Sequence, residues 1–144
     1  MLDLSIPVSN AVCSLKDDIL SEAQAIEEWM NQLTEQDEKE AKIMKSLCEI
    51  CNSNTKLELH HIAGRKHDYR TITVCRICHD ELSDTQNQWD GRWWKPDQPE
   101  RIREAFFLMG LRDILLLKAK KTYNTIYKSL AMKLGIEISK RLRA

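Results

Sequence analysis

The chain has 144 residues, of which 31% are charged and 42% apolar, and its formal net charge is zero. This length suits one domain or one small module with arms, and the composition is ordinary for a soluble protein. The first residues lack the basic segment of a signal peptide, and the most apolar stretch, residues 105–117, is too short and too charged to span a membrane. We therefore expect a cytoplasmic or nucleoid-associated protein.

The zero net charge hides an uneven distribution of charge along the chain. Residues 1–47 carry a net charge of −6, residues 48–99 one of −1 and residues 100–144 one of +7. Such asymmetry is typical of a C-terminal part that faces nucleic acid. The alternative is that the acidic and basic segments are solvated faces that attract each other.

The N-terminal segment, residues 1–47, predicts an acidic helical arm. We expect an irregular start over residues 1–13 and a helix from Ser14, with Asp17 three residues later. An apolar stripe then recurs at helical spacing, and it consists of Ile19, Ala23, Ile26, Met30 and Leu33. Thr34 and Asp37 predict the start of a second helix, whose stripe would be Ala41, Met44 and Leu47. The arm either forms a homodimer or an autoinhibitory contact, or it packs on its own chain.

Two Cys-x-x-Cys pairs follow the arm and predict a structural zinc site. The pairs are Cys48 with Cys51 and Cys75 with Cys78, and 23 residues separate them, enough for a hairpin that brings the pairs together. Four thiolates match the tetrahedral coordination of structural zinc. A redox motif would explain one pair but not both. The fifth cysteine, Cys13, is left as a free thiol, and the pattern indicates a reducing compartment.

The segment between the cysteine pairs predicts two strands and a basic loop. Residues 57–62 and 70–74 have the composition of strands, and a helix is expected from His79 to about Asn87. Arg65 and Lys66 lie in the loop, where they are candidate phosphate contacts. Three tryptophans follow the helix, at positions 89, 93 and 94. They either fill the small zinc core or stack on bases.

The C-terminal segment predicts a basic helical region. Asp97, Pro99 and Glu100 indicate a helix start with Asp97 as N-cap, and the helix would run to about Lys121. We expect it to be buried, in the core or at a subunit interface. Farther on, the Gly135 region resembles a helix-turn-helix. The alternative is a helix that ends at Gly135 and leaves a basic tail.

Taken together, the motifs between Cys48 and His79 resemble the HNH endonucleases, which have a ββα-metal fold. The matching residues are Cys48, Cys51, the run Leu57-Glu58-Leu59-His60-His61-Ile62 and the run Cys75-Arg76-Ile77-Cys78-His79. The resemblance covers about 40 of the 144 residues. It implies that His61 is the general base, that His60 and His79 bind a catalytic divalent metal of unknown identity, and that DNA is the substrate.

The chain departs from the HNH pattern at two positions. The central Asn corresponds to Arg70, or to His67 or Asp68 if the loop is aligned through Gly64-Arg65. The second helix histidine of some relatives corresponds to Ser83, a poorer ligand. These departures leave open a degenerate module that binds DNA without cutting it.

The sequence thus predicts an α+β protein in which a small, zinc-stapled ββα-metal (treble-clef-like) module is flanked by helices. The expected segments are an acidic helical arm (1–47), an HNH-like zinc module (48–96) and a basic helical region (97–144). The predicted function is metal-dependent hydrolysis of DNA phosphodiesters. The alternatives are an inactive zinc-binding module for nucleic acid or protein, and a purely structural zinc knuckle.

Overall fold

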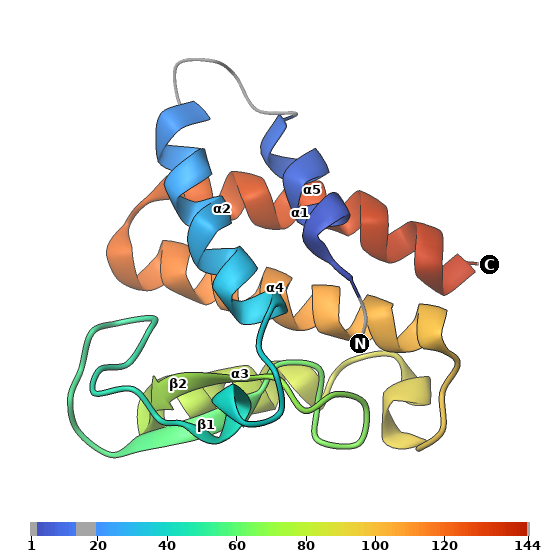
Figure 1. The fold of residues 1–144 in the computed structure, drawn as a ribbon, viewed down its shortest axis with the longest axis horizontal. Helices are drawn as coiled ribbons and strands as arrows, with labels where there is room; N and C mark the ends of the chain where they lie inside the picture. Colours follow the sequence, from blue (N-terminus) through green and yellow to red (C-terminus); the bar gives the residue numbers. More distant parts are fainter. Residues whose placement is uncertain (1–2, 14–19, 144) are drawn as a thin grey trace.

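The structure is a computed structural model that describes residues 3–13 and 20–143. It confirms the predicted α+β class, with a two-stranded antiparallel sheet and five α-helices in the described ranges (Figure 1). The elements are α1 (Ser5–Cys13), α2 (Leu20–Thr34), η2 (Glu40–Lys42), β1 (Leu57–His61), β2 (Thr71–Cys75), α3 (Arg76–Gln86), η3 (Gly91–Trp94), α4 (Glu100–Thr122) and α5 (Thr125–Arg143). Both strands and the helix after them begin and end within three residues of the predicted bounds.

The hairpin of β1 and β2 has two faces with different neighbours. The strands pair from Leu57 opposite Cys75 to His61 opposite Thr71, and side chains alternate between the faces along each strand. The inner face, with Glu58, His60, Ile72 and Val74, lies toward α3 and the core. The outer face, with Leu59, His61, Thr71 and Thr73, is covered in part by residues 36–49. Thr71 donates a hydrogen bond to the Ala41 carbonyl (2.6 Å), and Thr73 accepts one from the Lys45 amide (3.0 Å).

Helix α4 is the central element of the fold. It lies between the hairpin with α3 on one side and the other long helices on the other (Figure 1). Residues around its whole circumference are buried, including Phe106, Phe107, Leu108 and Met109 in succession. A helix that is apolar on every side must be buried on every side. The predicted burial of this helix in the core is therefore confirmed.

The predicted irregular start is wrong, because α1 is a helix. Asp3 caps it by accepting hydrogen bonds from the amide (3.1 Å) and the hydroxyl (2.7 Å) of Ser5. Pro7 lies in the first turn, where a missing amide proton costs no helical hydrogen bond. The predicted helix start at Ser14 and the thiol of Cys13 lie outside the described part of the chain. Helix α2 confirms the apolar stripe from Ala23 onward, since Ala23, Ile26, Met30 and Leu33 are buried. The first member of the predicted stripe, Ile19, lies outside the described residues.

The second predicted arm helix is also wrong. Only the short 3₁₀ turn η2 forms, and Asp37 accepts a hydrogen bond from the Glu40 amide at its start (2.7 Å). Ala41 is buried, but Met44 and Leu47 are about half exposed. The segment is extended because it follows β2 and gives its backbone polar groups to the hairpin instead of to a helix.

Two C-terminal predictions need correction. Pro99, not Asp97, is the N-cap of α4, and Asp97 adopts a left-handed backbone conformation instead (φ 62°). Helix α5 continues through Gly135, so neither a helix-turn-helix nor a helix end occurs there. Nothing lies within 4 Å of the place where a Cβ on Gly135 would be. The remaining helical turns outweigh the roughly 1 kcal/mol cost of one glycine in a helix.

One apolar core includes residues of all three predicted segments, such as Met30, Cys78 and Phe106. The segment boundaries stay a prediction, but the two flanking segments pack against each other, since α5 contacts both α1 and α2. None of the helices in the described part of the chain combines the length and apolar character that crossing a bilayer requires.

Candidate metal centre

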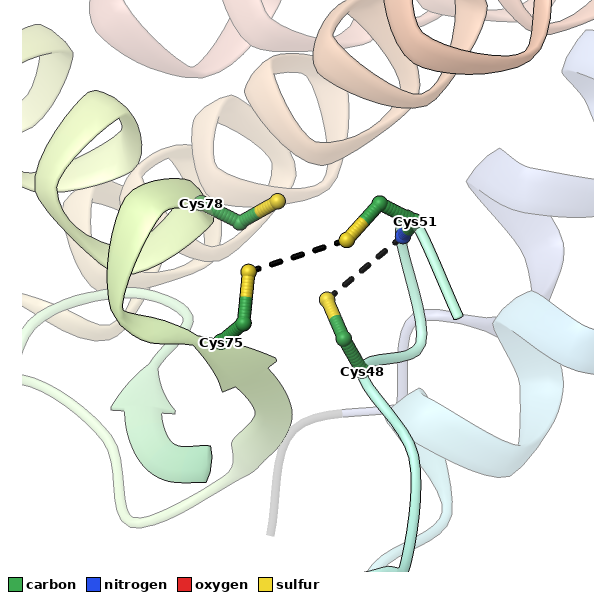
Figure 2. A group of neighbouring side chains, drawn as sticks. All are labelled: Cys48, Cys51, Cys75 and Cys78. Carbon is green, nitrogen blue, oxygen red and sulfur yellow. Dashed lines mark hydrogen bonds between the residues drawn. The ribbon is translucent and has the colours of Figure 1, made fainter. Parts of the chain in front are cut away.

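The four predicted cysteines meet at one point. Cys48 and Cys51 come from the loop before β1, Cys75 ends β2, and Cys78 lies in the first turn of α3; the four side chains point toward one another (Figure 2). Their sulfur atoms all lie within 4.8 Å of one another, and the Cys51 and Cys75 sulfurs are 3.6 Å apart. A tetrahedral zinc ion with Zn–S bonds of about 2.3 Å needs sulfurs about 3.8 Å apart. The four thiols therefore fit a structural metal ion.

The electrostatics of the cluster favour a bound cation. Burial raises the pKa of the Cys48 thiol, but the backbone amides of Cys51, Cys75 and Ile50 lower it by more, to about 7. Burial and neighbouring sulfurs raise the pKa of both Cys51 and Cys78. The second and later thiols thus resist ionisation without a positive charge between them. A divalent metal supplies that charge and releases their protons.

Glu49 and Lys118 fix the first cysteine pair to the rest of the chain. The Glu49 carboxylate accepts hydrogen bonds from the Thr73 amide (2.9 Å) and the Lys45 ammonium (2.7 Å). Lys118, on α4, donates to the Glu49 carbonyl, and its ammonium lies 4.3 Å from the centre of the Trp29 ring. A positive charge and a strand amide therefore orient the loop that carries Cys48 and Cys51.

Two of the three predicted catalytic histidines are brought together. His60 projects from the inner face of β1, and His79 projects from α3, with ring centres 5.2 Å apart and planes at 88°. Glu58 lies 3.5 Å from Nδ1 of His79, and the Ser83 hydroxyl lies 3.4 Å from the same nitrogen. Burial, followed by the charges of His79 and His61, lowers the pKa of His60 to about 3. The His60 ring is thus neutral near pH 7, as a metal ligand must be.

The third histidine, His61, lies on the outer face of the hairpin. It lines a shallow depression together with Leu59, Tyr69 and Thr71, whereas His60 and His79 lie across the strand. Burial and the charge of Arg65 lower its pKa, and Asp68 opposes them. His61 is therefore a neutral imidazole that can accept a proton near pH 7. Within the described residues, only the cysteine cluster brings three or more metal-ligating side chains close enough for one ion.

The predicted phosphate contacts, Arg65 and Lys66, are both exposed in the loop after β1. Lys66 donates a hydrogen bond to the carbonyl of Trp94 (3.2 Å), so it ties this loop to η3. Arg65 lies near His61 and has no hydrogen-bond or ion-pair partner within the described part of the chain. Of the two, Arg65 is the more available cation.

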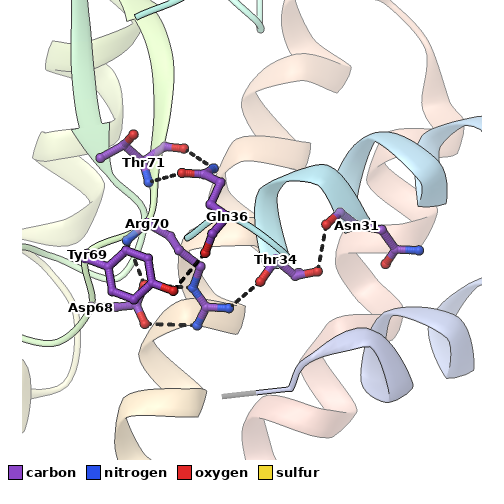
Figure 3. Close-up of polar contacts among 7 residues, drawn as sticks. All are labelled: Asn31, Thr34, Gln36, Asp68, Tyr69, Arg70 and Thr71. Atoms are coloured by element: carbon purple, nitrogen blue, oxygen red, sulfur yellow. Dashed lines mark hydrogen bonds and ion pairs between the residues drawn. The ribbon is translucent and has the colours of Figure 1, made fainter. Parts of the chain in front are cut away.

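The residue at the central position of the motif, Arg70, is completely buried and fixes the shape of the loop. Its guanidinium binds both carboxylate oxygens of Asp68 (2.8 and 2.9 Å) and the Thr34 carbonyl at the end of α2 (2.7 Å) (Figure 3). It also lies 3.9 Å from the centre of the Phe107 ring. Gln36 adds a second link, since its amide side chain bonds both the N–H (3.0 Å) and the carbonyl (2.6 Å) of Thr71.

The sequence alone did not predict the structural roles of Arg70 and Gln36, because their hydrogen-bond partners are 36 and 35 residues away in the chain. The one sequence feature that could have indicated a buried ion pair was Asp68, two residues before Arg70.

Comparison with known proteins adds no family: no family model, no curated protein and no solved structure matches this chain.

Proposed function

We propose that the chain is an HNH-like, metal-dependent DNA endonuclease whose ββα-metal module is stapled by structural zinc. The observation that carries the proposal is the meeting of His60 and His79 between β1 and α3, next to four cysteines with the geometry of a zinc site. Two imidazoles from a strand and a following helix, held in place by a separate staple, are what a catalytic metal in this kind of module needs.

Each residue has a distinct role in this proposal. Cys48, Cys51, Cys75 and Cys78 hold zinc, which fixes α3 relative to the hairpin. His60 and His79 would hold a divalent ion, which would supply a Lewis acid to polarise the phosphodiester. His61 takes a proton from the attacking water, because its lowered pKa keeps it neutral. Arg65 contacts a neighbouring phosphate.

The position of His61 favours a second candidate, an inactive zinc module that binds nucleic acid or protein. His61 faces Thr71 and Tyr69, on the side of the strand opposite His79. In the catalytic proposal, the phosphate lies on the face of β1 that carries His60, whereas the base His61 lies on the other face. The attacking water must therefore bridge the two faces at the end of the strand. In the second candidate, no such approach is needed, and the buried Arg70 only maintains the loop.

A nicking assay separates the two candidates. Supercoiled plasmid is incubated with the zinc-loaded chain and added Mg²⁺ or Mn²⁺, and His61→Ala and His79→Ala are compared with the unchanged protein. We expect His61→Ala to reduce nicking by at least about 100-fold, the usual contribution of acid–base catalysis. We expect His79→Ala to reduce nicking because it removes a ligand of the catalytic metal. Lys42→Ala is the matched control, because Lys42 lines the same depression as His61 but carries no imidazole.

The outcomes assign the function. Nicking that survives His61→Ala at an unchanged rate excludes His61 as the base. Binding to DNA that weakens with salt, without nicking in any metal, favours the inactive module. A chain that neither binds nor cuts DNA, while retaining one zinc, excludes the nuclease and the DNA-binding module. It leaves a zinc module that binds protein or a purely structural zinc knuckle.

A further inference from the structure

A small aromatic cavity lies directly beside the loop that follows His61. Its walls are Gly64, Arg65, Lys66, His67, Trp93 and Trp94, and its volume is about 200 Å³. Pockets for drug-sized ligands usually have about 300–1,000 Å³, so this one admits a single planar ring system. The loop folds back on the end of β1 through a hydrogen bond from the Gly64 amide to the His61 carbonyl (3.2 Å). The cavity is therefore adjacent to the proposed base.

One wall of the cavity is fixed and another is free. The Trp93 indole donates a hydrogen bond to the Ala63 carbonyl (2.9 Å) and packs so closely on Gly64 that a Cβ there would lie 2.6 Å from the indole nitrogen. Trp94 is 53% exposed, and its ring centre is 4.9 Å from that of Trp93. The prediction that the tryptophans fill the core is thus confirmed for Trp89, which is buried. Trp94 instead presents a large aromatic surface to solvent.

One residue of the cavity wall, His67, has a buried ring nitrogen without a hydrogen-bond partner. His67 is only 4% exposed, and its Nε2 lies 2.7 Å from the Trp93 carbonyl. A carbonyl can only accept, so Nε2 carries a proton and donates this hydrogen bond. Nδ1 is buried and has no hydrogen-bond partner. Such a group is costly in a folded protein, because a buried polar atom has left its hydrogen bond to water without replacing it.

We propose that this cavity binds one unpaired nucleobase, with the adjoining phosphate at Arg65. A base offers a flat ring that stacks on the exposed Trp94, and its backbone supplies an anionic phosphate as a partner for the Arg65 guanidinium. A base enters such a cavity only when it has left the stack of a duplex. The preferred nucleic acid is therefore single-stranded or locally unpaired. This inference rests on the proposed function in one respect, that nucleic acid is the ligand.

Fluorescence anisotropy with the full, zinc-loaded chain tests the inference. The probes are a labelled 12-nucleotide thymidine strand, a duplex of equal length and the same single strand with abasic positions. Trp94→Ala should weaken binding to the single strand by about 5- to 150-fold, the range that base stacking provides, and leave duplex binding unchanged. Trp94→Phe should restore most of the affinity. Tyr123→Ala is the matched control, because it also removes an exposed aromatic ring (Tyr123 is 91% exposed), but one that does not line the cavity.

Arg65→Ala gives an independent readout. It should weaken single-strand binding and reduce the slope of affinity against salt by about one phosphate contact, whereas Lys120→Ala should leave that slope unchanged. Equal loss of single-strand and duplex binding on Trp94→Ala, no loss at all, or no preference for the strand with bases over the abasic strand overturns the inference. Plasmid nicking without single-strand binding also overturns it but leaves the proposed function intact.

Discussion

The zinc module and the helical layer are stabilised by different means. In the module of the hairpin and α3, two five-residue strands and the helix are joined by four clustered cysteines, whereas α1, α2, α4 and α5 supply most of the apolar core that both regions share. A module of this size rarely folds on hydrophobic burial alone, and a metal compensates for that. We therefore expect the geometry of the candidate site to depend on a metal ion at the four cysteines as well as on packing against the helices.

Besides the shared apolar core, a few specific buried contacts join the two regions, and we call this boundary the seam. Arg70 binds the Thr34 carbonyl at the end of α2, the Trp89 indole binds Asp113 of α4 (2.8 Å), and Gly110 of α4 lies against the Ile62 carbonyl. Polar groups buried in this way must keep their partners, because an unpaired one costs about 1–3 kcal/mol. The seam therefore determines how precisely the hairpin is held against the helices.

The largest expected effect is loss of the metal. Chelation, or Cys75→Ser, should lower the melting temperature by more than about 10 °C and disorder the zinc module, because structural zinc contributes about 10–16 kcal/mol in small zinc-binding peptides. Circular dichroism should show that a large part of the helical signal persists, since most residues of the apolar core lie on α1, α2, α4 and α5. Cys13→Ser is the matched control and should retain one zinc per chain. An unchanged melting temperature after complete removal of zinc would contradict this account.

Loss of the buried arginine should have the next largest effect. Arg70→Met removes the partner of the Asp68 carboxylate and of the Thr34 carbonyl, and breaking a buried ion pair in this way costs about 3–5 kcal/mol. Urea denaturation measures the free energy of unfolding. Arg76→Ala is the control, because the Arg76 side chain is 61% exposed and its pair with Glu58 is worth less than about 1 kcal/mol.

The second half of this test concerns the partner of Arg70. Adding Asp68→Asn to Arg70→Met should recover part of the lost stability, because the buried carboxylate no longer lacks a counter-charge. If the double variant is as unstable as the sum of both single variants, the ion pair is not the reason for the burial of Arg70.

The features that sequence predicted well are those set by local pattern. The spacing of Cys48, Cys51, Cys75 and Cys78 predicted the cluster because four thiolates at such spacing have few other uses. The β-branched run before Cys75 predicted β2, and the continuous apolar stretch after residue 104 predicted a buried helix. In each case the residues that specify the structure are neighbours in the chain.

The features that sequence could not predict depend on distant partners. Pattern alone cannot show that the Gln36 side chain would bond the backbone of Thr71, or that residues 40–47 would follow the hairpin instead of forming a helix. The placement of His61 has the same origin. Adjacent strand residues point to opposite faces, and which face carries α3 is decided by tertiary packing. The roles of the three histidines stay predictions for that reason.

Added bulk at the close contact between α4 and the end of β1 should lower the stability by less than the loss of Arg70 does. Gly110→Ala places a Cβ 2.0 Å from the Ile62 carbonyl oxygen, so α4 must move away from the end of β1. Overpacking of this kind costs about 1–3 kcal/mol. Gly135→Ala is the matched control in α5, where the space is open, and it should stabilise the chain by up to about 1 kcal/mol. Equal effects of both substitutions in thermal unfolding would show that the close approach of α4 is not required.

The smallest expected effect concerns charge at the seam. Burial raises the pKa of the Asp113 carboxyl, although Arg112 and the Trp89 indole oppose this. A raised pKa in the folded state contributes stability below the ordinary pKa of 3.8 that is lost as the pH rises through the folded value. Asp113→Asn keeps an acceptor for Trp89 and removes this loss, so we expect a gain below about 1 kcal/mol at pH 7. Urea denaturation of both proteins from pH 4 to pH 7 should show curves that converge toward acid pH. A loss of stability at pH 7 would mean that the Arg112 pair, and not burial, dominates at this position.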